Sequence, residues 1–170
     1  MKKKILILSG GISKERKISL DTGFQVAKEL KKKGYQIKIC EPDFNLEKNI
    51  QKFKPNIIFN ALHGQFGEDG YIQSVLENYG VPYTHSGVIA SAKAMDKEIS
   101  KKILVKNNIL TPKFLNYSFD DKTSHLKSLI AKKLGYPVVI KPINEGSSVN
   151  VFICNKKNLI QKLKYLKSYK

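Results

Sequence analysis

The first residues that could carry chemistry follow a short apolar run near the N-terminus. Lys4–Leu8 suits a buried strand, and Gly10-Gly11-Ile12-Ser13-Lys14-Glu15-Arg16 comes directly after it. Paired glycines let the backbone approach a small ligand closely, and the Glu15 carboxylate could hold an ammonium group. A surface loop with a Glu15–Arg16 pair is an equally simple explanation of the segment alone. A dinucleotide-binding loop is excluded, because the sequence lacks the GxGxxG pattern here.

A second group is His63-Gly-Gln-Phe-Gly-Glu-Asp-Gly70. Its three glycines recur every third residue, and a histidine with two acids is unusual for a purely structural turn. Taken separately, the side chains have simpler roles. Glu68 and Asp69 would suit the positive end of a helix, and His63 alone would more often be a hydrogen-bonded core histidine.

The third group is Lys141-Pro-Ile-Asn-Glu-Gly-Ser-Ser148. A lysine at the end of a strand and a Gly-Ser-Ser loop can offer phosphate oxygens a positive charge, backbone N–H groups and hydroxyls. The segment lacks the GxxxxGK[ST] spacing of a Walker A loop. A serine-rich β-hairpin turn remains the alternative for this segment alone.

The elements around these groups alternate between strand and helix. After the first strand, a helix is expected over Ser19–Lys33 with Leu20, Phe24, Ala27 and Leu30 on its buried face. Strands at Tyr35–Cys40 and Asn56–Asn60 complete a βαβ pattern, which indicates an open α/β sheet. Ligands bind at the carboxyl ends of the strands in such sheets. The first two groups both leave strands at that edge.

The character of the sequence changes near Ala94–Asp96, where we place a domain boundary. Before it, Asp69 is expected to cap a short helix that ends at Gly80. The elements expected after it are a helix capped by Asp96 and reaching Lys106, a helix over Asp121–Leu134, a hairpin of strands Tyr136–Pro142 and Val149–Cys154, and a helix over Asn158–Leu166.

Composition limits the partners. The formal net charge is +17, yet Arg16 is the one arginine among 31 basic residues. Direct base readout favours arginine, so we expect neither a nucleic-acid nor a membrane partner. Cys40 and Cys154 lack metal-site spacing and are expected to be buried thiols. The N-terminal apolar run is too short for a signal peptide, which indicates a cytoplasmic protein.

In this order, the motifs resemble the D-alanine–D-alanine ligases of the ATP-grasp family. The matching elements are Gly-Gly-x-Ser-x-Glu-Arg, His-Gly-x-x-Gly-Glu-Asp-Gly, Pro-Tyr-Thr…Ser-Gly…Ala-Ser-Ala…Asp-Lys and Val-Ile-Lys-Pro…Glu-Gly-Ser-Ser-Val. The resemblance implies an α/β protein. Residues 1–95 would form an open parallel-sheet, Rossmann-like pre-ATP-grasp domain that binds substrate. Residues 96–170 would form an α+β small ATP-grasp subdomain, truncated.

The resemblance also implies roles for individual residues. The Glu15 carboxylate would bind the ammonium of the first D-alanine, and His63 would lie beside that subsite. Ser147 would link to Glu15 through hydrogen bonds, so both are expected in the catalytic set. The residues expected to bind ATP are Lys97, Lys141, Glu145, Gly146, Ser147 and Ser148. The sequence departs from the usual pattern at Ser74, His85 and Asn150, which affects loop geometry and removes no proposed catalytic group.

A complete ligase of this family is about twice as long. The resemblance implies a homodimeric enzyme that uses ATP with Mg²⁺ or Mn²⁺. Because of its length, we expect this chain to be an N-terminal fragment of such an enzyme, inactive alone. No metal ligand is expected in the chain; those ligands would lie in the C-terminal half. The alternatives are a related ligase with another acceptor, such as D-lactate, and a non-catalytic basic binding module.

Overall fold

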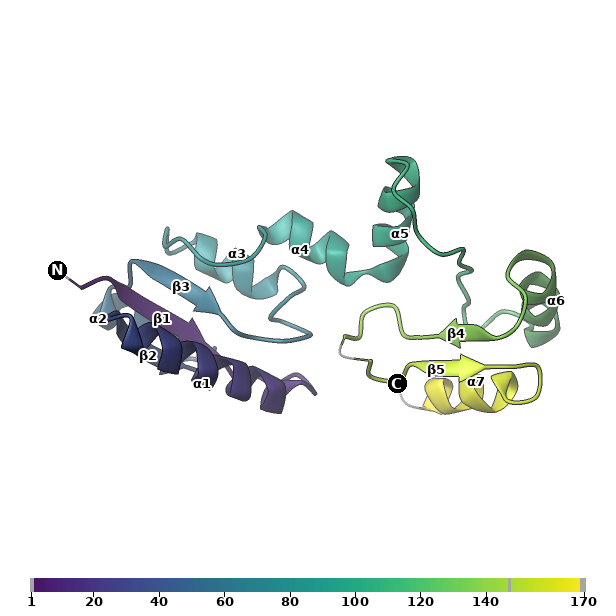
Figure 1. The fold of residues 1–170 in the computed structure, drawn as a ribbon, viewed down its shortest axis with the longest axis horizontal. Helices are drawn as coiled ribbons and strands as arrows, with labels where there is room; N and C mark the ends of the chain where they lie inside the picture. Colours follow the sequence, from purple (N-terminus) through teal and green to yellow (C-terminus); the bar gives the residue numbers. More distant parts are fainter. Residues whose placement is uncertain (1, 147, 169–170) are drawn as a thin grey trace. The chain divides into compact units, whose positions relative to one another are not determined.

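The chain divides into two units, each with its own sheet (Figure 1). The computed structural model describes residues 2–146 and 148–168. The first unit is Met1–Met95 and the second is Asp96–Lys170. Each is described by itself below.

The first unit is built on a parallel sheet of three strands. These are β1 (Lys4–Leu8), β2 (Gln36–Cys40) and β3 (Ile57–Asn60), in the order β2-β1-β3. In this register Leu6 of the central strand is paired with Lys38 on one side and Ile58 on the other. Strand β1 is buried because helices cover both faces of the sheet, which explains why it is a continuous apolar run. The expected α/β class with a parallel sheet is confirmed.

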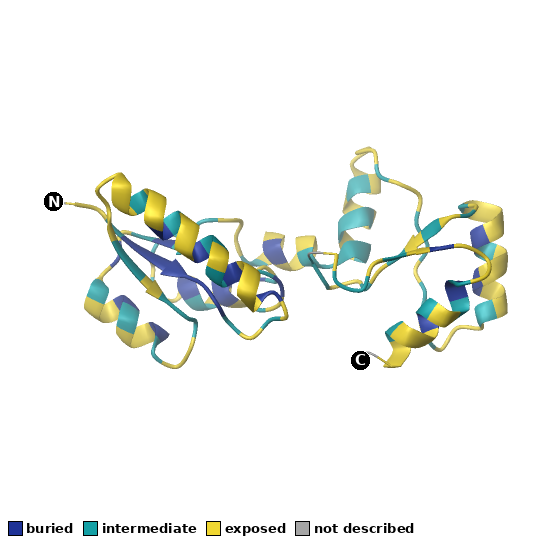
Figure 2. Ribbon diagram, turned by 60° about the horizontal axis from the view of Figure 1, so that its bottom comes forward, coloured by how far each residue is buried: buried dark blue, intermediate teal, exposed yellow. Residues whose placement is uncertain are grey.

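The helices of the first unit are α1 (Arg16–Lys32), α2 (Leu46–Phe53), α3 (Tyr71–Glu77) and α4 (Val88–Met95). The first three cover the faces of the sheet, and α4 contacts α3. Helices α2 and α3 pack through Leu46, Ile50, Ile72 and Leu76 against Leu6, Leu8 and Ile58. Ala27 of α1 packs with Ile5 and Ile7 on the other face. Figure 2 shows the resulting band of buried residues along β1 and the inner side of α1.

The buried face of α1 differs from the expected one. Phe24 was expected to point inward, but it is 62% exposed. The buried residues of the helix are Ser19, Gly23 and Ala27, which recur every fourth position. These small side chains bring α1 close to the sheet: a Cβ added at Gly23 would lie 2.5 Å from the Cβ of Ser9. The larger Phe24 therefore has no room on that side.

Two other local expectations also need correction. Gly70, with φ of 94°, is the N-cap of α3, and Asp69 instead accepts hydrogen bonds from the backbone N–H groups of Phe66 and Tyr71. Helix α4 was not expected from the sequence. The segment before it pairs with the sheet through a single parallel bridge between Ile58 and Tyr83.

The second unit has a two-stranded antiparallel sheet of β4 (Val138–Ile140) and β5 (Phe152–Cys154), with Val139 paired to Ile153. Its helices are α5 (Lys97–Lys106), α6 (Thr123–Lys133) and α7 (Leu159–Ser168). Its core joins α6 and α7 to one face of this hairpin through Leu126, Ile130, Cys154, Leu159 and Leu163. Because side chains alternate along a strand, Val139 and Ile153 point the other way and are 56% and 71% exposed.

Both cysteines are free thiols; Cys154 is buried and Cys40 is half-buried. Over residues 2–146 and 148–168, no helix combines the length and the apolar character needed to cross a membrane.

Candidate functional site

The loop after β1 is held in place by buried hydrogen bonds. The backbone N–H of Gly10 donates to Ser19 Oγ at 2.8 Å, and the Ser19 hydroxyl donates to the Ala61 carbonyl, also at 2.8 Å. One buried serine therefore joins the loop, helix α1 and the segment after β3. Gly10 has φ of 91°, a conformation that favours glycine, and an added Cβ would displace the flexible side chain of Glu41, whose Oε2 would lie 2.5 Å away.

The loop after β3 is equally constrained. The side chain of buried Asn60 donates to the Gly67 carbonyl at 2.8 Å and accepts from the backbone N–H of Leu62 at 3.1 Å. The backbone N–H of Gly64 donates to Glu68 Oε2 at 2.8 Å. The Ser13 hydroxyl donates to the His63 carbonyl at 2.6 Å, which ties this loop to the first one. Two segments far apart in sequence thus form one rigid edge of the sheet.

Glu15 lies where these loops meet. It precedes α1 as the N-cap residue, but its side chain makes no capping hydrogen bond. The residue is only 4% exposed, and its Oε1 has no hydrogen-bond partner among the described residues. A Cβ added at Gly64 would approach Glu15 Oε2 to 3.4 Å, so the glycine leaves room for this carboxylate. A buried carboxylate oxygen without a partner is costly and favours the binding of a cation.

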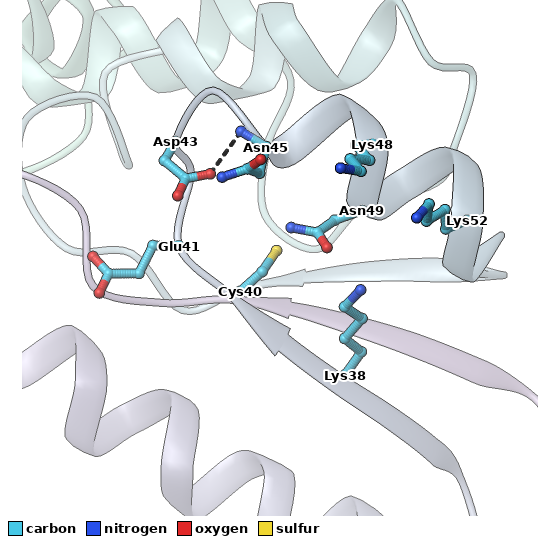
Figure 3. A pocket seen from close by; sticks show the side chains of 8 residues that line it. All are labelled: Lys38, Cys40, Glu41, Asp43, Asn45, Lys48, Asn49 and Lys52. Atoms are coloured by element: carbon cyan, nitrogen blue, oxygen red, sulfur yellow. Dashed lines mark hydrogen bonds between the residues drawn. The ribbon is translucent and has the colours of Figure 1, made fainter.

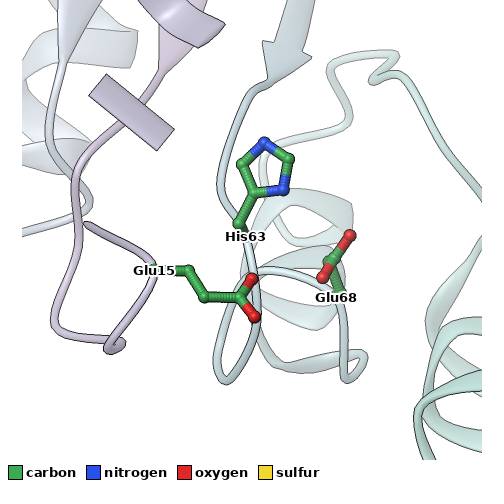
Figure 4. Close-up of side chains that lie close together, drawn as sticks. All are labelled: Glu15, His63 and Glu68. Atoms are coloured by element: carbon green, nitrogen blue, oxygen red, sulfur yellow. The ribbon is translucent and has the colours of Figure 1, made fainter. Parts of the chain in front are cut away.

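His63 and Glu68 complete the cluster around Glu15. One ligand atom from each of the three side chains lies within 4.8 Å of the others (Figure 4). His63 Nε2 is 3.1 Å from the hydroxyl of Thr22, which orients the ring. The structure therefore brings together Glu15 and His63, both expected from the sequence, and adds Glu68. The sequence alone suggested only a helix-terminal role for Glu68, because its separation from His63 does not reveal that the intervening turn folds them together.

The other expected residues lie in the second unit, around the end of β4. Asp96 caps α5 by accepting a hydrogen bond from the backbone N–H of Ile99 at 2.8 Å. This places Lys97 at the start of the helix, where its Nζ donates to the Ile143 carbonyl at 3.0 Å and also to the Glu145 carbonyl. Lys97 is thus held against the loop that follows Lys141.

Lys141 is exposed directly after β4. Burial lowers the pKa of Lys101, and the nearby positive charge of Lys141 lowers it further. The Lys101 ammonium donates to Thr111 Oγ1 and to the Pro112 carbonyl, each at 2.8 Å. The end of β4 therefore carries several lysine charges close together, which favours an anion.

The loop after Lys141 turns sharply. The Gly146 carbonyl accepts a hydrogen bond from the backbone N–H of Val149 at 2.9 Å. Ser148 and Asn150 adopt φ of 60° and 57°. Asparagine tolerates the conformation of Asn150 better than most residues other than glycine. The expected Ser147 lies outside the described residues.

A separate open hollow of about 500 Å³ lies beside β2 (Figure 3). Its lining side chains come from β2, α2 and the segment that joins them: Lys38, Cys40, Glu41, Asp43, Asn45, Lys48, Asn49 and Lys52. Burial raises the pKa of the Cys40 thiol to about 11, because this effect outweighs the smaller, opposite effect of the Lys38 charge. Because the thiolate is the nucleophile, this cysteine is unreactive near neutral pH.

Comparisons with known proteins relate the chain to one family. Residues 40–86 match a family described as "D-ala D-ala ligase N-terminus", and residues 103–169 match one described as "D-ala D-ala ligase C-terminus". A D-alanine–D-alanine ligase of Pelagibacter ubique is 68% identical over 99% of this chain, which corresponds to 56% of that protein. The chain thus spans about half the length of the curated relatives that it matches.

Solved structures show the same likeness. A D-alanine–D-alanine ligase from Bacillus anthracis matches 98% of this chain and 54% of its own, with a TM-score of 0.80 and 36% identity. A structure of the ligase from that organism complexed with ATP matches with a TM-score of 0.73 and 32% identity, over 98% of this chain and 55% of that one. Fold and sequence together relate this chain to a class of ligases, one of which was solved with ATP bound. The chain belongs to the D-alanine–D-alanine ligase family.

Proposed function

We propose that this chain supplies the amino-acid subsite and part of the ATP site of a D-alanine–D-alanine ligase. The observation that carries the proposal is the buried Glu15 carboxylate, whose Oε1 has no partner among the described residues and which lies beside His63. An α-ammonium group would supply the missing charge and hydrogen-bond donors, and such charge-assisted bonds are among the strongest in proteins. The names of its relatives support D-alanine as the amino acid.

In the proposed reaction, Glu15 holds the ammonium of the first D-alanine and so orients its carboxylate. A carboxylate oxygen attacks the γ-phosphorus of ATP, the bond to the ADP oxygen breaks, and an acyl phosphate forms. The uncharged amine of the second D-alanine then attacks the acyl carbon. The resulting tetrahedral intermediate expels phosphate and loses a proton, which leaves the dipeptide.

On the phosphate side, we propose that Lys97 and Lys141 neutralise charge on ATP during phosphoryl transfer. The loop from Glu145 through Gly146, Ser147 and Ser148 would close over the phosphates and exclude water that could hydrolyse the acyl phosphate. The hydrogen bonds from Lys97 Nζ to the Ile143 and Glu145 carbonyls support a coupling between this lysine and the loop.

The catalytic cation of the family, Mg²⁺ or Mn²⁺, does not fit the residues described. Mg²⁺ requires several oxygen ligands. The group of three or more candidate ligands found among residues 2–146 and 148–168 is Glu15, His63 and Glu68, which includes a nitrogen donor and lies on the amino-acid side. No step is therefore derived through the metal. We propose that its ligands, a homodimeric assembly and the full activity belong to a longer, cytoplasmic enzyme.

A chimera tests the proposal directly. This chain would be followed by the remaining portion of the 68% identical relative, and phosphate release would be measured with ATP and D-alanine. Glu15→Gln should lower kcat/KM for D-alanine by roughly 10- to 100-fold, the equivalent of about 1.5–3 kcal/mol for one charge-assisted hydrogen bond. Glu29→Gln, which alters an exposed carboxylate of α1, is the matched control.

Two results would contradict the proposal: phosphate release that does not require D-alanine, or an active Glu15→Gln chimera with unchanged kcat/KM. Offering D-lactate in place of the second D-alanine in the same assay tests the alternative acceptor. The isolated 170-residue chain should release no phosphate above background.

A further inference from the structure

The cluster of Glu15, His63 and Glu68 also has the donor set of a transition-metal site. It combines one imidazole nitrogen with two carboxylate oxygens, all within 4.8 Å of one another. In tetrahedral zinc geometry, bonds of about 2.0–2.2 Å place two ligand atoms roughly 3.3–3.6 Å apart, so binding requires the side chains to close by up to roughly 1.5 Å. Glu68 is an exposed side chain and can make that movement.

The surroundings of the cluster orient its ligands. The Thr22 hydroxyl lies 3.1 Å from His63 Nε2, which leaves the other ring nitrogen for the cluster. Figure 4 shows a nitrogen of the ring turned toward the carboxylate of Glu68. Glu68 is itself held by the backbone N–H of Gly64 at 2.8 Å through Oε2. Hydrogen bonds of this kind, which fix the orientation of ligands, are characteristic of metal sites.

The buried carboxylate provides an independent indication of a cation. Glu15 is 4% exposed and its Oε1 has no partner among the described residues, so a positive charge is needed to offset the cost of burial. A hydrated Mg²⁺ suits this position poorly, because magnesium prefers oxygen ligands in octahedral geometry. Zn²⁺ accepts both histidine nitrogen and carboxylate oxygen, and it stands high in the order of affinities of divalent metals.

We propose that Glu15, His63 and Glu68 form a Zn²⁺ site whose occupation excludes the ammonium group of an amino acid, so that zinc inhibits the protein. The proposal of a metal site depends only on the three side chains. Competition of Zn²⁺ with D-alanine rests on the function proposed above.

Calorimetric titration of the metal-free 170-residue chain with Zn²⁺ tests the site. We expect saturable binding that His63→Asn and Glu68→Gln each weaken by at least about tenfold. Substituting a residue that only hydrogen-bonds to a metal ligand already lowers metal affinity by about tenfold or more, so loss of a ligand should cost at least as much. The Glu68→Gln substitution removes the charge of a metal ligand but keeps an oxygen that can accept the hydrogen bond from the Gly64 N–H, so the turn is preserved. His125→Asn, at an exposed histidine of α6, is the matched control and should leave binding unchanged.

Substitution with Co²⁺ adds a spectroscopic test. Its visible absorption should indicate nitrogen and oxygen ligands, without the thiolate charge-transfer bands that Cys40 or Cys154 would produce. Binding that is insensitive to both His63→Asn and Glu68→Gln, or a thiolate spectrum, would overturn the metal site. Circular dichroism of each variant verifies that it is folded.

A titration with D-alanine separates the two proposals. D-Alanine and L-alanine chelate free Zn²⁺ equally, so D-alanine that weakens Zn²⁺ binding to the protein more than L-alanine does supports the shared site. If D-alanine binds without displacing Zn²⁺, competition is refuted and the proposed amino-acid subsite survives. If Zn²⁺ binds as expected but D-alanine does not bind even to the metal-free chimera, the proposed function fails and the metal site stands.

Discussion

A single carboxylate determines much of the chemistry proposed for this protein. The Glu15 side chain neither caps α1 nor reaches solvent, and the loops around it are fixed by Ser13, Ser19 and Asn60. Such rigidity positions a ligand well, because the loops lose little conformational freedom when the ligand binds. The cost falls on the unliganded protein, which keeps a charged oxygen away from water.

That cost can be measured. Glu15→Gln should raise the free energy of unfolding of the first unit by about 1 kcal/mol in the absence of ligand, because it removes an uncompensated buried charge. Urea unfolding would provide the measurement, and the exposed Glu29→Gln should change stability by less than about 0.5 kcal/mol. A clear loss of stability in Glu15→Gln would mean that the carboxylate already has a stabilising partner.

For individual residues, the sequence indicates which side chains could belong to a site better than it indicates which side chains contact one another. Glu15 and His63 could be singled out because the glycine-rich motifs that contain them resemble those of a known ligase family. Glu68 could not be assigned to the same cluster, since its position depends on a turn held by the Gly64 N–H and by Asn60. The partner of the His63 ring, Thr22, lies on α1, and such pairing between distant segments is set by tertiary packing.

Helix α1 is the element that connects core and site. It carries Glu15 at its start and packs against β1 through Ser19, Gly23 and Ala27. Its distance from the sheet therefore affects the position of the carboxylate. That distance is limited by Gly23, where an added Cβ would lie 2.5 Å from Ser9 Cβ and 2.7 Å from Ser9 Oγ.

Gly23→Ala should destabilise the first unit by about 1–3 kcal/mol, the usual cost of overpacking. Helix propensity alone predicts the opposite sign, a gain of up to about 1 kcal/mol. Thermal or urea unfolding distinguishes the two, with Gln25→Ala on the exposed side of the same helix as the control. A stabilised Gly23→Ala variant would show that α1 does not pack as closely as described.

Most elements could be predicted from periodicity, with ends that differ by a few residues. The exceptions have physical causes. Phe24 fits the helical period of the apolar face, but small residues set the contact with the sheet. Gly70 is the N-cap of α3 because it adopts a positive φ, while Asp69 stabilises the preceding turn. Helix α4 (Val88–Met95) has only one buried residue, Ser91, so no clear apolar stripe marks it.

On the scale of the whole molecule, each unit has its own hydrophobic core. Leu76 belongs to the core of the first unit, and Leu159 to that of the second. We propose that the boundary near Met95 separates two units that unfold independently.

Leu159→Ala should destabilise the second unit by about 2–5 kcal/mol, the usual range for a buried leucine. Hydrogen exchange followed by mass spectrometry should show faster exchange in α6 and α7, with the first unit unchanged. Leu76→Ala is the reciprocal control and should affect only the first unit. Equal acceleration in both units by either variant would indicate a single cooperative structure.

The outward face of the β4–β5 hairpin has a consequence for handling the protein. Val139 and Ile153 present a cross-strand apolar pair to solvent, and the chain carries a formal net charge of +17. At low ionic strength, electrostatic repulsion between positively charged copies of the protein prevents contact between these exposed apolar side chains. In about 1 M salt the screening length falls to about 3 Å, and that barrier is largely lost. The colloidal behaviour of this basic protein should therefore be governed by salt, with self-association increasing as its charges are screened.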